Sequence, residues 1–112
     1  MSTIYSQVLV SKADGFEADK VIDKFITEEC DQVFMQYLSL TGSTTKVAID
    51  LGPVTTAVFL YITSDQAIQV YKNNSMESWD AKEVFMVIGC EITALHILAT
   101  EDSEVFIYAA GA

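Results

Sequence analysis

His96 is the only histidine of the chain, and imidazole is the side chain that most readily exchanges protons near neutral pH. Nucleophilic catalysis usually places such a base beside a nucleophile and holds it with a third group. His96 instead lies within the apolar run of residues 94–98. This position favours a structural role, and the alternative is an interface residue whose charge changes near neutral pH.

The two cysteines, Cys30 and Cys90, are far apart in the chain and form no CxxC pair. A zinc site needs closely spaced Cys and His ligands, which one histidine and two remote cysteines do not supply. In a reducing compartment such cysteines behave as small, buried apolar residues. We therefore predict two buried thiols, and neither a disulfide nor a metal or other cofactor.

The sixteen acidic residues could supply a pair of catalytic carboxylates or a calcium site. Two segments are rich in acids, residues 28–31 and 101–104, but neither has EF-hand spacing, and both fit solvated turns. No pair of acids stands out for catalysis, and Gly-rich phosphate loops are absent. The sequence therefore predicts a protein that is not an enzyme.

The aromatic residues are candidates for binding, because exposed aromatic side chains are favoured anchors of interfaces. We predict an interface that contains four aromatic residues: Trp79, Tyr61, Tyr71 and Tyr108. The three tyrosines fall near strand ends or on less buried faces, and Trp79 lies in a polar loop. For Trp79 the alternative is that it caps one end of the fold. Three phenylalanines are expected in the core: Phe59, Phe85 and Phe106.

Composition excludes several classes of partner. The net charge is -10, with six lysines and no arginine, whereas nucleic acids and anionic membranes require clustered cations. The chain is 51% hydrophobic, yet no stretch approaches the ~20 apolar residues that span a bilayer. The first residues lack the pattern of a signal peptide, so we expect a cytosol-like site of synthesis. The length of 112 residues fits a single domain, 1–112.

The second half predicts a succession of short strands. Residues 47–51 and 67–72 alternate apolar and polar side chains, residues 57–63 are apolar on both faces, as in a strand covered on two sides, and residues 84–88 are strongly β-prone. Gly52-Pro53, Ser64-Asp65 and residues 73–75 are the expected turns between them. Residues 91–99 and 103–109 are expected to form a hairpin around an acidic tip at 100–102.

The first half is less regular. Residues 4–10 suit an opening strand, and residues 33–40 suit a strand that is buried on both faces. Between them, residues 19–29 pair their apolar residues in the rhythm of an amphipathic helix. The alternative is a hairpin that turns near residues 28–31. The predicted fold is all-β, an antiparallel β-sandwich or a jelly-roll-like small barrel, with one short helix around 19–29 as an option.

Residues 46–73, together with residues 91–112, resemble small virion proteins of tailed bacteriophages. The similar patterns are Ile-Asp-Leu-Gly at 49–52, Val-Thr-Thr-Ala at 54–57, Phe-Leu-Tyr-Ile-Thr-Ser-Asp at 59–65, Ile-Gln-Val-Tyr at 68–71, Ile-Thr-Ala-Leu-His-Ile at 92–97 and Ala-Gly-Ala at 110–112. The resemblance implies a β-sandwich displayed on a capsid or tail, as a trimer or ring. It carries no catalytic residues.

We therefore expect a non-enzymatic structural protein of the virion, a capsid decoration protein or a tail component, assembled in the host cytoplasm. Its expected partners are copies of itself and other virion proteins. Apolar surface that meets sister subunits, and negative charge that keeps the free subunit soluble, both agree with this expectation. The alternative is a carbohydrate- or receptor-binding β-sandwich module that uses Trp79 and neighbouring tyrosines. A small enzyme with paired carboxylates is a third hypothesis.

Overall fold

The structure, a computed structural model, describes residues 2–14 and 17–112. Over these ranges the fold is all-β, and every strand pairing is antiparallel. The strands are β1 (Ser2–Asp14), β2 (Glu17–Cys30), β3 (Gln32–Leu40), β4 (Val47–Ile49), β5 (Ala57–Lys72), β6 (Trp79–Ile92), β7 (Leu95–Ala99) and β8 (Ser103–Gly111). The described residues include no helix that is long and apolar enough to cross a membrane.

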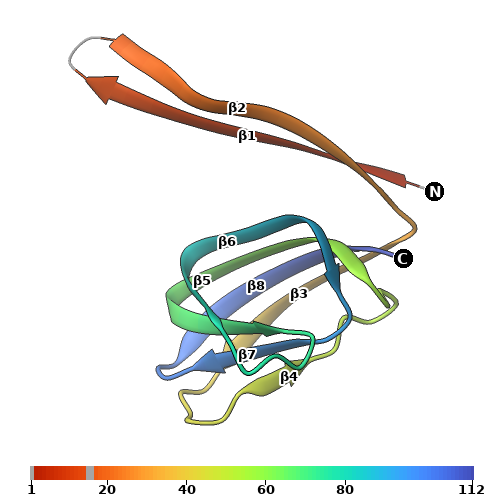
Figure 1. Cartoon of the computed structure of the whole chain (residues 1–112). Helices are drawn as coiled ribbons and strands as arrows, with labels where there is room; N and C mark the ends of the chain where they lie inside the picture. The colour runs from red at the N-terminus through yellow and green to blue at the C-terminus, as the bar shows by residue number, and fades with distance from the viewer. Residues whose placement is uncertain (1, 15–16) are drawn as a thin grey trace.

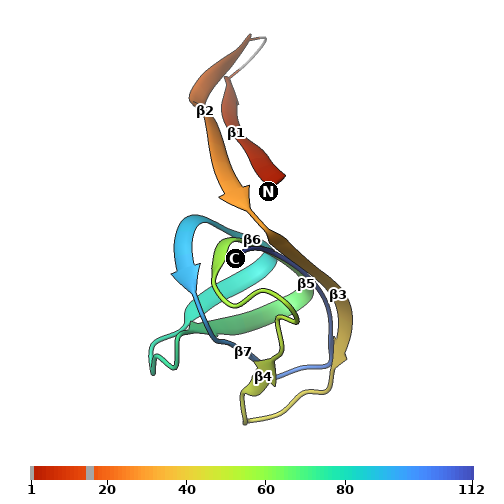
Figure 2. The same cartoon turned by 90° about the vertical axis from the view of Figure 1, so that its right-hand side faces the viewer.

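The chain forms a compact body and a projecting hairpin. β1 and β2 pair only with each other, from Ser2 opposite Cys30 to Asp14 opposite Glu17, and we call this hairpin the arm. Figures 1 and 2 show the arm standing off from the body, to which it is joined where β2 continues into β3. The other six strands form a single sheet.

The long strand β5 organises this sheet because it bends between Ser64 and Ile68. Its first half pairs with β8 and its second half pairs with β7, while β6 follows both halves on the other side. β3 extends the sheet beside β8, and β4 extends it beside β7. The sheet therefore curls into a half-barrel (Figure 1). Its first layer contains β3, β8, the first half of β5 and most of β6, and its second layer contains β4, β7 and the second half of β5.

The core lies between these two layers. Successive side chains of a strand point to opposite faces, so every second residue points inward. The largest fully buried side chains come from both layers: Leu60, Ile62, Val105, Ile107, Ile92, Val70, Leu95 and Ile97. Each contributes on the order of 1.5–3 kcal/mol relative to an exposed position. The inward-facing rows therefore hold the body together.

The expected turn at Ser64-Asp65 is a bend within one strand. The Ser64 hydroxyl donates to the Gln66 carbonyl oxygen at 2.7 Å, and the Asp65 carboxylate accepts the Glu104 backbone N–H at 2.8 Å. These polar contacts replace the ladder where β5 changes direction. β6 continues along both sides of the bend, so the chain turns a corner and does not reverse.

The helix predicted around residues 19–29 is wrong, because these residues belong to β2. Phe25 is exposed and Ile26 is half-buried, which is the alternation of a strand. Pairing with β1 along the whole segment overrides the local helical rhythm. The alternative hairpin near residues 28–31 is also wrong. β2 and β3 do not pair, and the Asp31 N–H donates to the Gly111 carbonyl oxygen at 2.8 Å as the chain enters the body.

The hairpin predicted from residues 91–99 and 103–109 is wrong as well. β7 and β8 do not pair with each other; Ala99 lies opposite Ile68, and Val105 lies opposite Ser64. Both strands use β5 as their partner, one on each side of its bend. Two other predicted strands have different lengths: β4 ends at Ile49, and β6 begins at Trp79, which is therefore in a strand and not in a loop.

Candidate interaction surface

The first layer carries apolar side chains on its solvent side as well as its core side. Register partners share a face, and three rows cross β3, β8, β5 and β6 in that order. We call these rows the outer face: Val33, Ala110, Phe59 and Ile88 in the first row, Met35, Tyr108, Tyr61 and Met86 in the second, and Tyr37, Phe106, Thr63 and Val84 in the third. Only Thr63 in this set is a conventionally polar residue.

Much of the outer face is in contact with solvent. Met35 is 62% exposed and Tyr37 is 79% exposed, and Val33, Val84 and Met86 are also exposed. The prediction that residues 33–40 are buried on both faces is therefore wrong for this chain alone. An antiparallel sheet with one solvated face normally alternates apolar and polar residues. A solvated face that is apolar instead marks a site of interaction.

The root of the arm covers one end of the outer face. Cys30 is buried together with Phe59 and Ala110, and Ile4 and Ile88 pack against this small cluster. Tyr61 and Tyr108 of the second row also pack against this cluster, next to the β2–β3 junction. The exposed side chains of the face lie on its two outer strands, β3 and β6, whereas those of β5 and β8 between them are buried or half-buried.

The arm itself carries two exposed aromatic residues. Tyr5 is 68% exposed and Phe25 is 63% exposed, and their ring centroids are 6.0 Å apart. Tyr5 and Gln7 are two residues apart on β1, so their side chains point to the same face of the arm. Phe25 is the register partner of Gln7 and shares that face. Ile4, on the other face, packs on the body. The arm therefore carries an exposed aromatic pair, and Tyr5 of this pair also lines the groove between the arm and the outer face.

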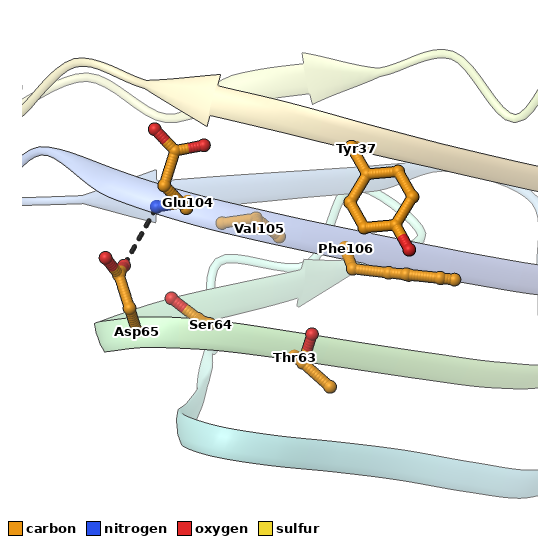
Figure 3. Close-up of a pocket in the computed structure, with 7 residues that line it drawn as sticks. All are labelled: Tyr37, Thr63, Ser64, Asp65, Glu104, Val105 and Phe106. Carbon is orange, nitrogen blue, oxygen red and sulfur yellow. Dashed lines mark hydrogen bonds between the residues drawn. The ribbon is translucent and has the colours of Figure 1, made fainter.

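Two open grooves mark the outer face, and Phe106 lines both of them. The groove below the arm root has a volume of ≈ 490 Å³ and is lined by Thr3, Ile4, Tyr5, Phe59, Tyr61, Phe106 and Tyr108. The second, of ≈ 360 Å³, lies toward the bend (Figure 3). There Tyr37 and Phe106 stack edge to face at 4.6 Å, while Asp65 and Glu104 lie at the opposite end.

The structure brings together two of the four aromatic residues predicted for an interface. Tyr61 and Tyr108 are register partners in the second row of the outer face. Tyr71 lies in the second layer, where its hydroxyl donates to Gln69 Oε1 at 3.3 Å and Lys46 Nζ lies 4.7 Å from its ring centroid. Tyr71 is thus not part of the outer face.

Trp79 is also separate from the outer face. It is half-buried, packs against the core and lies 5.3 Å from the Phe85 ring centroid. Lys72 Nζ lies 4.6 Å from the centroid of its indole ring. These contacts fit a residue that closes the end of the body between the two layers, rather than an open stacking platform.

The phenylalanines predicted for the core lie in three environments. Phe85 packs against the main core. Phe59 is buried, but it points to the outer side and is covered by the root of the arm. Phe106 is half-buried in the third row of the outer face, beside Tyr37 and Tyr61. The prediction of a core position is therefore wrong for Phe106, because outward-facing residues alternate with Val105 and Ile107.

His96 lies in β7 opposite Tyr71, on the outer side of the second layer. Its Nδ1 atom is buried and has no hydrogen-bond partner in the described part of the chain. The cysteines are free thiols; Cys30 is buried, and Cys90 is half-buried and donates to the Ala57 carbonyl oxygen at 3.3 Å. Burial raises the pKa of the Cys90 thiol above its ordinary value. No group of three or more His, Cys, Asp or Glu side chains that could hold a metal ion occurs among the described residues.

The central rows of the outer face are aromatic and aliphatic, and such side chains bury a large area when a partner covers them. No protein-family model, curated protein or solved structure is significantly similar to this chain. Four residues were missed by sequence reasoning: Tyr5, Phe25, Met35 and Tyr37. The available signal was the number of apolar residues in 33–40, which exceeds what one core-facing row can use.

Proposed function

We propose that the protein is a non-enzymatic structural subunit of a phage particle, which assembles with copies of itself through the outer face. In this assembly it packs on the capsid or tail, as a decoration protein or a tail component. The observation that carries the proposal is the row of exposed apolar residues on β3, above all Met35 and Tyr37. A subunit that functions alone would expose polar residues there.

The extent of the exposed surface supports assembly. The five exposed side chains of the outer face leave on the order of 500 Å² of apolar surface in water, which is in the upper half of the ~300–600 Å² of the largest, often functional, patch on a monomer. Burial of such a patch stabilises an assembly by roughly 25 cal/mol for each Å² removed from water. The net charge of -10 keeps the free subunit soluble and limits indiscriminate aggregation.

The proposal is tested by measuring mass in solution with light scattering over a wide range of concentrations. The wild type is expected to form a defined oligomer. The double variant Met35→Glu/Tyr37→Glu places two charges on the outer face and is expected to have the mass of one chain. Met76→Glu is the matched control, because Met76 is 94% exposed and lies outside the outer face, between β5 and β6.

A wild type that remains a single chain at millimolar concentration would overturn the proposal. Binding to purified particles then tests the placement. Wild type and Met76→Glu should sediment with capsids or tails, and Met35→Glu/Tyr37→Glu should stay in solution. Binding of the monomeric variant to a glycan array, with loss of that binding in Trp79→Ala, would instead support a carbohydrate-binding module.

A further inference from the structure

We infer that the occupant of the outer face is the arm of a second copy of this chain, with its Tyr5–Phe25 pair on the second and third rows. The contact is therefore head-to-tail: the arm of each copy docks on the face of the next. This inference rests on the proposed function, because it names the partner of the same surface. It adds a specific element, a direction and an architecture.

The arm needs a partner surface. Among the described residues its strands pair only with each other, and Ile4 and Cys30 are its members of the cluster at the root. A two-stranded hairpin that is not packed on a third element is marginally stable in water. Its exposed Tyr5 and Phe25 are the side chains that a partner would cover.

The arm covers only part of the outer face of its own body: Thr3, Ile4 and Tyr5 line the groove that it forms with the second and third rows, and they leave β3 uncovered. Ile4 and Cys30 fix its root over Phe59 and Ala110, and from there the arm rises away from the sheet (Figure 2). Met35 and Tyr37 consequently stay exposed although a complementary apolar surface exists in the same chain. A second copy offers that surface without any rearrangement of the first.

The areas agree with a specific contact. Tyr5 and Phe25 add on the order of 250 Å² of exposed apolar surface to the face, since large aromatic side chains bury about 150–250 Å² each when fully covered. Interfaces are about 57% apolar, so apolar burial on the order of 750 Å² corresponds to a contact of about 1,300 Å². That value lies within the ~1,200–2,000 Å² of stable, specific interfaces.

The chemistry favours a second copy over a basic partner. The central residues of the face and the aromatic pair of the arm are uncharged, so their contact requires no complementary charge. Copies that each carry a charge of -10 repel one another, and salt screens this repulsion. Self-association should therefore strengthen as salt increases, whereas binding of a cationic partner would weaken.

The arm and the face are different surfaces, so their contact is heterologous. Each chain has one of each, and repetition of one heterologous contact produces a closed ring or an open filament. An assembly built from face-to-face contacts would instead stop at two chains. The number of chains in the oligomer and the way they are joined therefore test this inference separately from the proposed function.

The test is a complementation experiment with two variants. Met35→Glu/Tyr37→Glu has a defective face and an intact arm; Tyr5→Glu/Phe25→Glu has a defective arm and an intact face. Each variant alone should have the mass of one chain. A 1:1 mixture should form a heterodimer with the mass of two chains and nothing larger, because only one arm and one face remain functional. Met76→Glu should behave as the wild type.

The outcomes separate the two proposals. A monomeric wild type overturns the proposed function and the inference together. A wild-type oligomer that persists in Tyr5→Glu/Phe25→Glu overturns the inference and leaves the proposed function in place. The same holds if both variants are monomeric and their mixture gives no heterodimer.

A photo-crosslinking amino acid at position 25 provides a measurement that does not depend on a charged substitution. Benzophenone at this position replaces Phe25 by a larger apolar group and should crosslink to a second chain within residues 32–40 or 103–111. Crosslinks restricted to the same chain, or joining two arms, would overturn the inference. Comparison of the crosslinked fraction at ~0.05 M and ~0.5 M salt should show an increase at the higher concentration.

Discussion

The Asp65 carboxylate accepts a hydrogen bond of 2.8 Å from the backbone N–H of Glu104, across the point where β5 bends (Figure 3). The Ser39 hydroxyl in turn donates its single proton to the Glu104 carboxylate, whose two oxygens lie 2.8 and 3.0 Å from Ser39 Oγ. Polar side chains thus connect β5, β8 and β3 at the point where the backbone pairing of β5 with β8 ends. The bend is a specific structure, and its parts can be tested separately.

Removal of the Asp65 carboxylate should destabilise the bend. Asp65→Ala leaves the Glu104 N–H without its acceptor, and we expect the free energy of unfolding to fall by about 1–2 kcal/mol. Asp65→Asn keeps an acceptor oxygen in the same place and should lose less. Urea unfolding followed by tryptophan fluorescence measures both changes. Equal losses of unfolding free energy in the two variants would show that the carboxylate stabilises the bend by some means other than this hydrogen bond.

Asn73 combines an unusual backbone conformation with a set of hydrogen bonds. Its φ is 51°, its Oδ1 accepts the Thr93 N–H at 2.7 Å, and its Nδ2 donates to the Glu91 carbonyl oxygen at 2.7 Å. Asn73→Ala loses these bonds and strains a left-handed backbone, so we expect a loss of roughly 2–3 kcal/mol.

Asn74 provides the matched control for this prediction. Its φ is 60°, but no side-chain hydrogen bond is found for it among the described residues. Asn74→Gly should therefore be neutral or slightly stabilising, while Asn73→Gly should lose about 1–2 kcal/mol through its missing bonds alone. Thermal unfolding of the two glycine variants measures the difference. Similar melting temperatures would contradict the assigned role of the Asn73 side chain.

Gly111 lies where two backbone segments meet closely. A Cβ atom at this position would overlap the carbonyl oxygen of Thr56, which accepts the Ala112 N–H at 3.0 Å. Because the obstacle is backbone, it cannot be relieved by a change of rotamer. Gly111→Ala should cost at least about 2 kcal/mol of unfolding free energy, whereas Ala112→Ser, at an exposed position, should change it little. Chemical denaturation distinguishes the two.

The Cys90 thiol should make stability depend on alkaline pH. Burial raises its pKa in the folded protein, so the folded state retains the proton at pH values where the unfolded chain has begun to lose it. The contribution is complete below the ordinary thiol pKa of about 8.5 and is lost as pH rises through the higher folded value. Unfolding free energies of wild type and Cys90→Ala, measured from pH 7.5 to 10.5, should therefore converge at the alkaline end.

A control is needed for this pH series because tyrosines and lysines also titrate there. Cys90→Ala removes only the thiol, so the difference between the two proteins isolates it. The rate of thiol modification gives an independent check: Cys90 should react slowly with a disulfide reagent at pH 7.5, and Cys30, which is buried, more slowly still. A pH-independent difference between wild type and Cys90→Ala would refute the prediction.

The sequence predicted the β-rich class and most strand positions because alternation is a local property. Residues 57–63 are a continuous apolar run and residues 67–72 alternate, and both segments belong to β5. Their connection could not be predicted from Ser64-Asp65, since the same two residues suit a turn or a bend. The choice is made by β6, which pairs with both halves of β5 and lies later in the chain.

The errors in the arm and the outer face have a similar origin. The apolar pairs of residues 21–22 and 25–26 fit one face of a helix or two faces of a strand, and only β1 decides between them. In residues 33–40 the apolar character was visible, but apolarity does not say what covers a side chain. A strand buried inside a domain and a strand waiting for a second subunit have the same composition.

The place of β8 in the sheet has a consequence for synthesis on the ribosome. β8 is the central neighbour of both β3 and β5, and Gln32 finds its partner only at Gly111. A nascent chain that has not yet been translated through residue 111 therefore lacks a complete β8, the strand that lies between β3 and β5 in the outer face. The surface that we propose for assembly therefore cannot form before β8 has been translated, and shorter nascent chains would lack the means to associate through it.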